Sequence, residues 1–315
     1  MTRTAHQHRP RRRRGRLARL LSTTLLGGVL AVSALVVPDS TVAPTDMALV
    51  KVPRAQGVDA PRDVVWILAV GSDARPGQLM TETRGDALQL VGINTRTGAA
   101  TGFAIPRDSY VPIPGHGSDK INAALFFGGP QVLARAVGDL VGIRPHYVFV
   151  TRFEKFEEMI NAIGGVTVHN PRRFHDDSIK PKGFRAGRLH LGGYDALAFS
   201  RIRYNLPRGD FDRSLNQQRT LRGIQRQVAD RARQRGFIER GVLSALKNMA
   251  TDASPTEVYR LARAVAAVRP GRITTCLVEG GIGNVGGASV VIPDVARIRR
   301  LGDRARDDAT LEGGC

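Results

Sequence analysis

The chain has 315 residues, of which 42% are hydrophobic, and its formal net charge at pH 7 is +19. That length and composition allow one large globular domain or two small ones with a sizeable core. The positive surplus indicates an anionic partner, such as a phosphate-rich polymer, lipid head groups or nucleic acid. The segment at the start of the chain then decides between these partners.

The first 38 residues predict a membrane anchor. Eight arginines precede any acidic residue, and an uncharged stretch of 18 residues, from Leu20 to Val37, follows them. A helix rises about 1.5 Å per residue, so this stretch covers roughly 27 Å and can cross a bilayer's hydrocarbon core. The arginines hold their end in the cytoplasm. We therefore expect a cytoplasmic basic tail (1–19), a single-pass transmembrane anchor (20–38) and an extracellular remainder.

A cleaved secretory signal is the alternative interpretation of this segment. A cut at Val32-Ser33-Ala34 would fall inside the apolar run, and a cut after Ala43 would leave Pro44 directly behind it. Small residues precede such cleavage sites, and proline after the cut is unfavourable. Both interpretations export the chain to the outside of the cell, which argues against a nucleic acid partner.

Residues 39–62 hold several Pro, Thr and Asp without a sustained period, so we interpret them as a linker. Apolar runs then predict strands at 64–70, 87–93, 100–105, 146–150, 166–169 and 273–278. Helical spacing predicts helices at 120–127, 130–141, 153–163, 192–200, 214–235 and, from a capping box at Ser254, to Val268. Strands interleaved with helices indicate an α/β domain, expected over 63–280, with a C-terminal extension at 281–315.

Aspartates and arginines gather at the predicted ends of these elements. Asp73 follows the first strand, Asp86 opens the second and Arg107 follows the third. Three more arginines precede the 214–235 helix, namely Arg201, Arg203 and Arg213. Guanidinium groups suit phosphate oxygens, and Mg²⁺ is typically held by one or two carboxylates plus phosphate oxygens. The set predicts a metal-assisted pyrophosphate site; ordinary turn residues and surface salt bridges are the alternative.

Seven short motifs follow one another between residues 64 and 224. They are Gly71-Ser72-Asp73-Ala74-Arg75, Arg84-Gly85-Asp86, Ile105-Pro106-Arg107-Asp108, Lys120-Ile121-Asn122-Ala123-Ala124, Gly164-Gly165-Val166, Ser200-Arg201-Ile202-Arg203, and Gly209-Asp210 through Arg213 to Gln217-Gln218. In this order the motifs resemble those of the LytR-CpsA-Psr family of cell-wall glycopolymer ligases. A single motif of this length is weak, whereas the ordered set is specific.

The resemblance implies a mixed central sheet flanked by helices, with a deep apolar pocket for a polyprenyl chain. Members of the family take an anionic glycopolymer from a polyprenyl-pyrophosphate carrier and join it to peptidoglycan through a phosphodiester, generally at a muramic acid 6-hydroxyl. We therefore expect a phosphotransferase in the cell membrane with its catalytic domain outside. The resemblance gives no optional extra C-terminal domain here, because 279–315 is too short.

The family's site residues can be carried over motif by motif. Asp73 and Asp86 would hold Mg²⁺, and together with Arg107 and Arg203 they are the expected catalytic residues. The expected substrate-binding residues are Arg75, Arg84, Lys120, Asn122, Arg201, Arg213 and Gln217. Either Asp73 or Asp86 could serve as the general base, although a carboxylate bound to a metal is a poor base.

The sequence departs from the family pattern at three positions. Ala87 stands where Ser or Thr commonly follows the second aspartate, and Asn216 stands where a further Arg is common. Asp212 replaces the usual Gly, and we expect it to neutralise Arg213 in part. The last motif is therefore less positively charged than in the family.

Two other activities remain open from the sequence. One is a hydrolase that releases the glycopolymer or cleaves the pyrophosphate carrier. The other is a non-catalytic protein that only binds polyprenyl lipids or the cell wall and has a regulatory role. Loss of function in Asp73→Ala with lipid binding retained would distinguish the enzymes from the binding protein.

Two further expectations concern the core and the cysteines. The predicted helices carry more apolar positions than one sheet face requires, and we expect some to line a tunnel that leads to Arg107. The candidates are Ala123, Leu125, Phe126, Leu133 and Val137, with Phe153, Phe156, Met159 and Ile160. Cys276 and Cys315 are either a disulfide that ties the tail to the body, as exported proteins favour, or two unrelated thiols.

Overall fold

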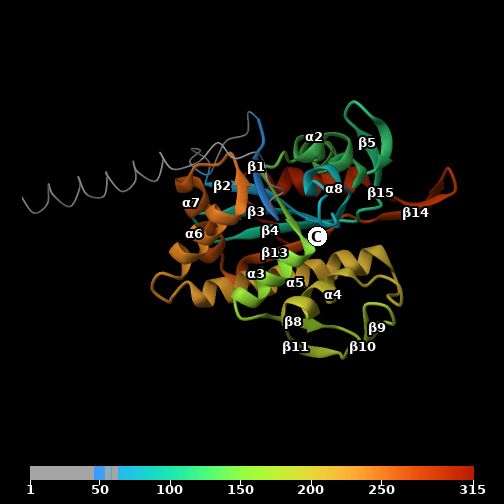
Figure 1. Ribbon diagram of the computed structural model, residues 1–315. Coiled ribbons are helices and arrows are strands. Elements are labelled where there is room, and N and C mark those ends of the chain that lie inside the picture. The colour runs from blue at the N-terminus through green and yellow to red at the C-terminus, as the bar shows by residue number, and fades with distance from the viewer. Residues whose placement is uncertain (1–45, 54–57, 59–62) are drawn as a thin grey trace, which may run out of the picture. The chain divides into compact units, whose positions relative to one another are not determined.

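The structure of the protein is a computed structural model, which describes residues 46–53, 58 and 63–315 (Figure 1). The predicted tail and anchor lie outside the described residues, as does most of the predicted linker. Within the described ranges, every helix is too short or too polar to span a bilayer. The membrane anchor therefore stays a prediction from the sequence.

Seven strands of the described chain form one central sheet, in the order β12-β1-β7-β2-β3-β4-β13. They are β1 (Met47–Lys51), β2 (Val64–Ser72), β3 (Gly85–Asn94), β4 (Ala100–Ile105), β7 (Tyr147–Arg152), β12 (Met249–Thr251) and β13 (Ile273–Leu277). The pairs β12–β1, β7–β2 and β4–β13 are parallel, and the other neighbours are antiparallel. The predicted mixed sheet is confirmed.

Helices cover both faces of this sheet, as Figure 1 shows. One face carries α2 (Ala123–Val141) and α8 (Val295–Ala305). The other carries α3 (Phe153–Ala162), α5 (Asp210–Arg231), α6 (Phe237–Asn248) and α7 (Pro255–Ala267). The expected capping box opens α7: Ser254 Oγ accepts from the Glu257 N–H, and the Glu257 carboxylate accepts from the Ser254 N–H. The predicted flanking of the sheet by helices is confirmed.

Alternate residues of the central strands face opposite sides, because successive side chains of a strand point in opposite directions. Leu68, Val70, Leu88 and Leu90 are buried in the core under α2 and α8. Beside them, Trp66 stands opposite Gly92, where a Cβ atom would lie 2.5 Å from the indole ring. A glycine at that position therefore makes room for the large side chain.

A smaller lobe follows α3 in the chain. It contains β8 (Val166–Asn170), β9 (Phe174–Asp176), β10 (Lys180–Phe184), β11 (Gly187–Leu191) and α4 (Gly193–Arg201). Its own core is built on three aromatic rings, those of Phe174, Phe184 and Phe199, whose centroids lie 5.3 to 5.4 Å apart. This packing fixes α4, whose last residue is Arg201, beside the main sheet.

The short elements complete the described fold. They are η1 (Met80–Glu82), β5 (Tyr110–Ile113), β6 (Gly117–Lys120), η2 (Pro270–Arg272), β14 (Gly280–Val285) and β15 (Ala288–Pro293). The last two form a hairpin that projects at the opposite side of Figure 1 from α6 and α7. Residues 281–315, which we expected as an extension, thus form β14, β15 and α8, and α8 belongs to the main core.

Two local expectations are wrong. Residues 47–51 lie within the expected linker, yet they form β1 between β7 and β12, where Leu49 and Ala48 are buried. The helix expected from Lys120 begins only at Ala123, because Lys120 pairs with Tyr110 at the end of β6. The apolar run of β1 is short, and the strand depends on its pairing and packing with elements that are distant in the chain.

The two cysteines form a disulfide, with 5.7 Å between their Cα atoms. Cys276 lies in β13 and Cys315 follows α8, so the bond fastens the residues after α8 to the sheet. Ala309 and Leu311 of that segment are buried in the core under α2 and α8. The expected tie between tail and body is confirmed.

Candidate functional site

The sheet topology brings three predicted site residues to one edge. Asp73 directly follows β2, and Asp86 is the second residue of β3, whose start lies beside the end of β2 because the two strands are antiparallel. β4 is in turn antiparallel to β3, so Arg107 emerges next to the same place. The strand ends therefore place two carboxylates and a guanidinium together.

Asp86 and Arg107 form an ion pair in which Arg107 Nη1 donates to Asp86 Oδ1. Partial burial and the nearby Asp86 carboxylate raise the pKa of Asp73, while Arg107 and Arg201 act in the opposite direction. Two carboxylates this close are stabilised by a cation between them. Mg²⁺ accepts such a pair when substrate oxygens and water complete its shell. No group of three or more His, Cys, Asp and Glu side chains occurs among the described residues that could hold a metal alone.

Arg213 lies in the first turn of α5, buried to 4% exposure, and pairs with Asp210. Burial, followed by the guanidinium groups of Arg107 and Arg203, lowers its pKa. The Nε atoms of Arg213 and Arg107 are both buried without a hydrogen-bond partner. Crowded guanidinium groups with unused donors fit a bound anion, because its oxygens accept those donors and offset the repulsion.

Asp108 lies between two more predicted residues. Its Oδ1 is 3.0 Å from Lys120 Nζ, and its Oδ2 is 3.5 Å from Arg203 Nη1. Arg203 Nη2 also donates to the Tyr204 hydroxyl at 3.0 Å, and the guanidinium lies 4.9 Å from the Tyr204 ring centroid. These contacts hold the Arg203 side chain in place before any ligand binds.

Arg201 and Gln217 border the same region from α4 and α5. The Arg201 guanidinium lies 4.5 Å from the ring centroid of Phe153. Gln217 Nε2 donates to the Ser200 carbonyl at 3.2 Å, and its Oε1 accepts from Gln89 Nε2 at 3.2 Å. Gln89 was missed by the sequence analysis, although a buried glutamine inside an otherwise apolar strand is a signal for it.

Five of the predicted residues do not line the cavity that opens beside the arginines, namely Asp73, Arg75, Arg84, Lys120 and Asn122. Among the described residues, Arg75 and Arg84 have exposed side chains that do not line the cavity beside the arginines. Asn122 is buried, and its backbone N–H donates to the Arg107 carbonyl at 3.3 Å. Asn122 therefore supports the turn that carries Arg107 rather than presenting its own side chain at the cavity.

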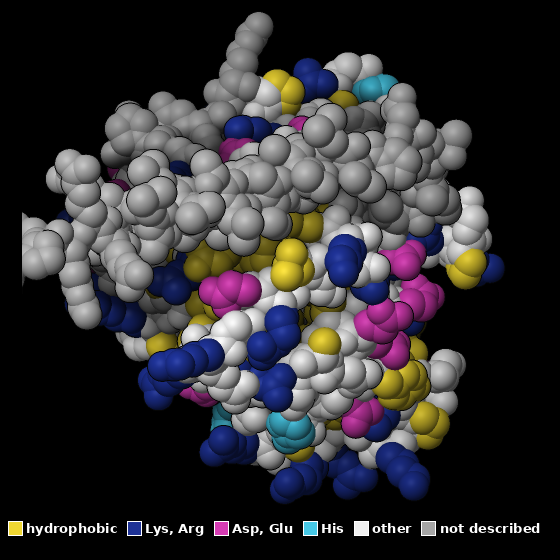
Figure 2. All heavy atoms as spheres, turned by 60° about the vertical axis from the view of Figure 1, so that its left-hand side comes forward, with side chains coloured by type: hydrophobic (Ala, Val, Ile, Leu, Met, Phe, Trp, Pro, Cys, Tyr) yellow, Lys and Arg dark blue, Asp and Glu magenta, His cyan; other side chains and the backbone are white. Residues whose placement is uncertain are grey.

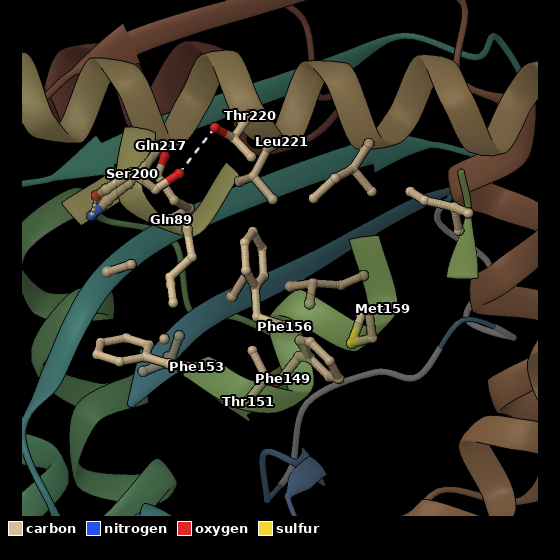
Figure 3. A pocket seen from close by; sticks show the side chains of 18 of the residues that line it. Gln89, Phe149, Thr151, Phe153, Phe156, Met159, Ser200, Gln217, Thr220 and Leu221 are labelled. Atoms are coloured by element: carbon tan, nitrogen blue, oxygen red, sulfur yellow. Dashed lines mark hydrogen bonds between the residues drawn. The ribbon is translucent and has the colours of Figure 1, made fainter. Parts of the chain in front are cut away.

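A cavity of about 700 Å³ opens on this cluster. Its floor is the sheet face opposite α2 and α8, and its other walls come from α3 to α7. In Figure 3 the side chains of Phe149, Phe156, Met159 and Leu221 point into the cavity, and Gln89 and Gln217 lie towards one end. Asp86, Arg107, Arg201, Arg203 and Arg213 line that cavity as well. An apolar space that ends at charged groups suits a lipid with an anionic head.

The predicted tunnel is therefore present, but only three of its nine predicted lining residues are correct. Phe153, Phe156 and Met159 of α3 line it. The candidates from α2 do not: Ala123, Leu125, Leu133 and Val137 are buried in the core on the opposite sheet face, and Phe126 is exposed. Ile160 packs in the core of the smaller lobe. Periodicity identifies an apolar helix face but not which side of the sheet it covers.

The three departures from the family pattern have different outcomes. Ala87 lines the cavity beside Asp86. We expected Asp212 to neutralise Arg213 in part, and this is wrong. Asp212 pairs with Arg208, whose Nε lies 3.0 Å from Asp212 Oδ1. Asn216 is buried and accepts from Arg219 Nη1 at 2.7 Å. The charge of Arg213 is instead matched by Asp210, one turn earlier.

One face of the described chain is rich in basic side chains. Figure 2 shows many Lys and Arg side chains on the face turned forward, with hydrophobic side chains visible in a recess between them. An anionic polymer is attracted to such a surface over distances of about a Debye length, roughly 8 Å at physiological salt. Surface charge and site charge thus favour the same kind of partner.

The structure is thus an α/β domain with a mixed sheet and an apolar cavity that ends at a cluster of arginines and Asp86. The model of the LytR_cpsA_psr family matches residues 39–307 of this chain. The chain belongs to that family.

Two relatives of this chain are teichoic acid transferases. A polyisoprenyl-teichoic acid–peptidoglycan teichoic acid transferase, TagU, of Bacillus anthracis is 34% identical over 197 residues, 62% of this chain and 62% of TagU. A TagU of Oceanobacillus iheyensis is 33% identical over 248 residues, 76% of this chain and 74% of that protein. The chain thus spans less than two thirds of the length of the B. anthracis relative.

Solved structures share the fold. The crystal structure of Bacillus subtilis TagV has 25% identity and a TM-score of 0.64, and the match covers 79% of this chain and 99% of TagV. TagT with bound octaprenyl pyrophosphate lipid has 22% identity and a TM-score of 0.61, covering 82% of this chain and 98% of TagT. The second likeness shows the fold alone.

Proposed function

We propose that the protein is a Mg²⁺-dependent phosphotransferase that joins an anionic glycopolymer, carried on polyprenyl pyrophosphate, to peptidoglycan through a phosphodiester bond. One observation carries the proposal: a cavity of about 700 Å³ lined by apolar side chains opens directly on Arg107, Arg203 and Arg213. The transferase names of the TagU relatives support the same reaction. The predicted single-pass anchor would hold the domain at the outer surface of the cell membrane, where both substrates lie.

Each part of the site has a role in this reaction. The polyprenyl tail fills the cavity, and the pyrophosphate meets the guanidinium groups of Arg107, Arg201, Arg203 and Arg213. The free Nε donors of Arg107 and Arg213 are satisfied by phosphate oxygens. Gln217 and Lys120 hold the neighbouring groups in position through Gln89 and Asp108. These contacts orient the phosphorus and stabilise the charge that spreads over its oxygens during transfer.

The bonds change as follows. A hydroxyl oxygen of peptidoglycan forms a bond to the phosphorus attached to the glycopolymer, and the bond from that phosphorus to the pyrophosphate bridge oxygen breaks. Polyprenyl phosphate leaves, and the hydroxyl proton passes to a carboxylate.

Asp73 and Asp86 would also hold the Mg²⁺ ion of the proposed reaction. Their mutual repulsion, which after burial is the largest cause of the raised Asp73 pKa, is what a cation between them would relieve. When bound, Mg²⁺ supplies charge stabilisation to the transferring phosphoryl group. Substrate oxygens and water must complete the shell, so we expect metal and donor to bind cooperatively.

The test incubates the detergent-solubilised full chain with a polyprenyl-pyrophosphate glycan and peptidoglycan fragments, and mass spectrometry detects the conjugate. Arg203→Ala should slow transfer at least tenfold, since losing one buried charge-assisted contact costs about 2 to 5 kcal/mol. Arg203→Lys should restore little, because an ammonium group cannot make the bidentate contact. Arg263→Ala, exposed on α7, is the matched control. Equal rates for Arg203→Ala and Arg263→Ala would reject the assigned site.

The same assay separates the two alternative functions. A hydrolase would release free glycan phosphate without a conjugate, and a non-catalytic binding protein would retain the lipid and form neither product. Asp86→Asn should abolish both the activity and its dependence on Mg²⁺. Transfer that continues unchanged in excess chelator would reject the role of the metal while leaving the transferase assignment intact.

A further inference from the structure

A second pocket of about 550 Å³ lies beside the arginine cluster and shares Arg203 and Tyr204 with the lipid cavity. Its walls are the segment between α4 and α5 and the start of α5 on one side, and the β14–β15 hairpin on the other. The described chain therefore has two spaces that meet at one arginine. The first has an occupant in the proposed function, and the second does not.

The polar groups of this second pocket favour hydroxyl groups over anions. Asp210 lines it with a side chain only 9% exposed, and its Oδ2 is buried without a hydrogen-bond partner, while Oδ1 pairs with Arg213. The cations on the same wall already have carboxylate partners: Arg203 contacts Asp108 and Arg208 contacts Asp212. An unpartnered carboxylate oxygen accepts a hydrogen bond from a hydroxyl group and repels a phosphate.

The apolar groups of the pocket suit a sugar ring. Tyr204 is 68% exposed and Ile282 is 70% exposed, and both border the pocket from opposite walls. A pyranose presents C–H groups on its faces and hydroxyls at its rim, so it matches walls that combine exposed apolar side chains with carboxylate oxygens. The pocket thus has the chemistry of a neutral carbohydrate site.

Its position also fits the acceptor of the reaction. The lipid cavity extends from the arginine cluster to α6 and α7 at the left of Figure 1. The β14–β15 hairpin lies at the right, on the other side of the arginine cluster. In phosphoryl transfer the attacking and leaving oxygens lie roughly in line on opposite sides of the phosphorus. A lipid phosphate that leaves towards the cavity requires an acceptor that arrives from the hairpin side.

We propose that the pocket between the α4–α5 segment and the β14–β15 hairpin binds the neutral sugar of the peptidoglycan strand that carries the attacking hydroxyl. This inference rests on the proposed transferase function and adds the acceptor subsite to it. Tyr204 and Ile282 contact the faces of the sugar, and Asp210 Oδ2 accepts a hydrogen bond from one of its hydroxyls. The hairpin then determines which acceptor is used.

The hairpin supplies a matched pair of variants. Ser289 lines the pocket, and its neighbour Ala288 is equally exposed but does not line it. Successive residues of a strand point to opposite faces, so Ser289→Phe fills the pocket and Ala288→Phe places the same ring on the other face. Both residues are exposed, so we expect both variants to fold. A melting curve for each variant checks this.

The experiment measures transfer by the full chain at varied concentrations of peptidoglycan disaccharide–peptide fragments, and separately the affinity for polyprenyl pyrophosphate. Ser289→Phe should raise the KM for the fragment at least tenfold, about 1.4 kcal/mol, with donor affinity unchanged. Ile282→Ala should raise the same KM by about threefold, because it removes only part of one wall. Ala288→Phe should match the wild type in both measurements.

Two outcomes would overturn the acceptor pocket. If Ser289→Phe and Ala288→Phe transfer equally well, the pocket takes no part in acceptor binding. If Ser289→Phe instead weakens binding of the glycan-loaded donor, the pocket holds the donor glycan. In both cases the wild type still forms the conjugate, so these results are distinct from a failure of the transferase function, in which the wild type forms none.

Discussion

The two faces of the central sheet are built from the same strands, yet one is filled with side chains and the other has a cavity beside its own packed core. Under α2 and α8 the strands present Leu68, Val70, Leu88 and Leu90, and the space is filled. On the opposite face, one residue along each strand, the cavity floor includes small or polar residues. These are Ala69, Gly71, Ala87, Gln89 and Thr151. Small residues on the strands, rather than a gap between elements, leave room for a ligand.

The helix layer formed by α2 and α8 stabilises the fold, whereas the layer on the other face provides the binding space. A packed core loses free energy whenever it is truncated, because neighbouring atoms cannot collapse into the gap. A cavity wall already faces empty space, so truncation there removes fewer contacts. Substitutions at matched positions on the two faces should therefore separate stability from lipid binding.

The largest expected effect is on the face under α2 and α8. Leu90→Ala should lower the free energy of unfolding by about 2 to 5 kcal/mol, since Leu90 is fully buried. Leu221→Ala, in the cavity wall on α5, should cost about 1 kcal/mol or less, because its side chain already borders the cavity. Chemical denaturation of the two variants measures the difference. Equal losses would mean that the two faces are packed alike.

The disulfide should contribute to stability through the face under α2 and α8, because it fastens Ala309 and Leu311 onto that face. Reduction, or Cys315→Ser, should lower stability by about 3 to 4 kcal/mol in the chain-entropy model for a loop of this length. Limited proteolysis should then cut the chain after α8 first. A reduced protein with an unchanged melting temperature and an uncut C-terminal segment would contradict this.

A large side chain placed in the cavity should weaken lipid binding and change stability little. Ala69→Phe should weaken binding of polyprenyl pyrophosphate at least tenfold, about 1.4 kcal/mol, with little change in stability. The adjacent Val70→Phe points to the face under α2 and α8 and should overpack it, at a cost of about 1 to 3 kcal/mol, with smaller effect on lipid affinity. Lipid titration measures the affinity of both variants, and thermal melting measures their stability. An Ala69→Phe protein that still binds lipid tightly would show that Ala69 does not border the lipid.

The smallest effect concerns a polar contact at the rim of the face that has the cavity. Glu257 accepts from Lys51 Nζ at 2.6 Å and from the Tyr147 hydroxyl at 2.9 Å. The Lys51 contact, followed by the Ser254 N–H, lowers the pKa of Glu257 from 4.5 to about 2.

The Glu257 carboxylate binds a proton less readily in the folded state than in the unfolded state. Its contribution to stability is therefore present above pH 4.5 and is lost as the pH falls towards 2. Glu257→Gln should cost about 1 kcal/mol at neutral pH and flatten the loss of stability in that range. Denaturation curves between pH 7 and 2.5 measure this. Parallel curves for variant and wild type would show that Glu257 does not contribute.

The sequence predicts the parts of the fold that depend on local pattern. The strands from Val64 to Ile105 have long apolar runs, and the capping box at Ser254 marks the start of α7. What it misses depends on distant partners. β1 depends on its pairing with β7 and β12 and on the burial of its side chains against distant elements. The side of the sheet that α2 covers follows from chain topology rather than from its apolar spacing.

The same distinction holds for the site. Motif order identifies Asp86, Arg107 and Arg213, which antiparallel pairing of the strands and the start of α5 bring together. It does not identify the partner of each charge. From the sequence alone, Asp212 is the expected partner of Arg213. In the structure, helical spacing places Asp210, three residues earlier, against Arg213 and turns Asp212 towards Arg208.

The cavity on one face of the sheet also determines how the protein responds to hydrostatic pressure. Unfolding lets water occupy internal space that the folded chain fills poorly, so the unfolded state has the smaller total volume. Compression therefore acts mainly on the layer formed by α5, α6 and α7 over the sheet, and much less on the layer under α2 and α8. A lipid tail in the cavity removes that space, and the loaded protein is then the less compressible form.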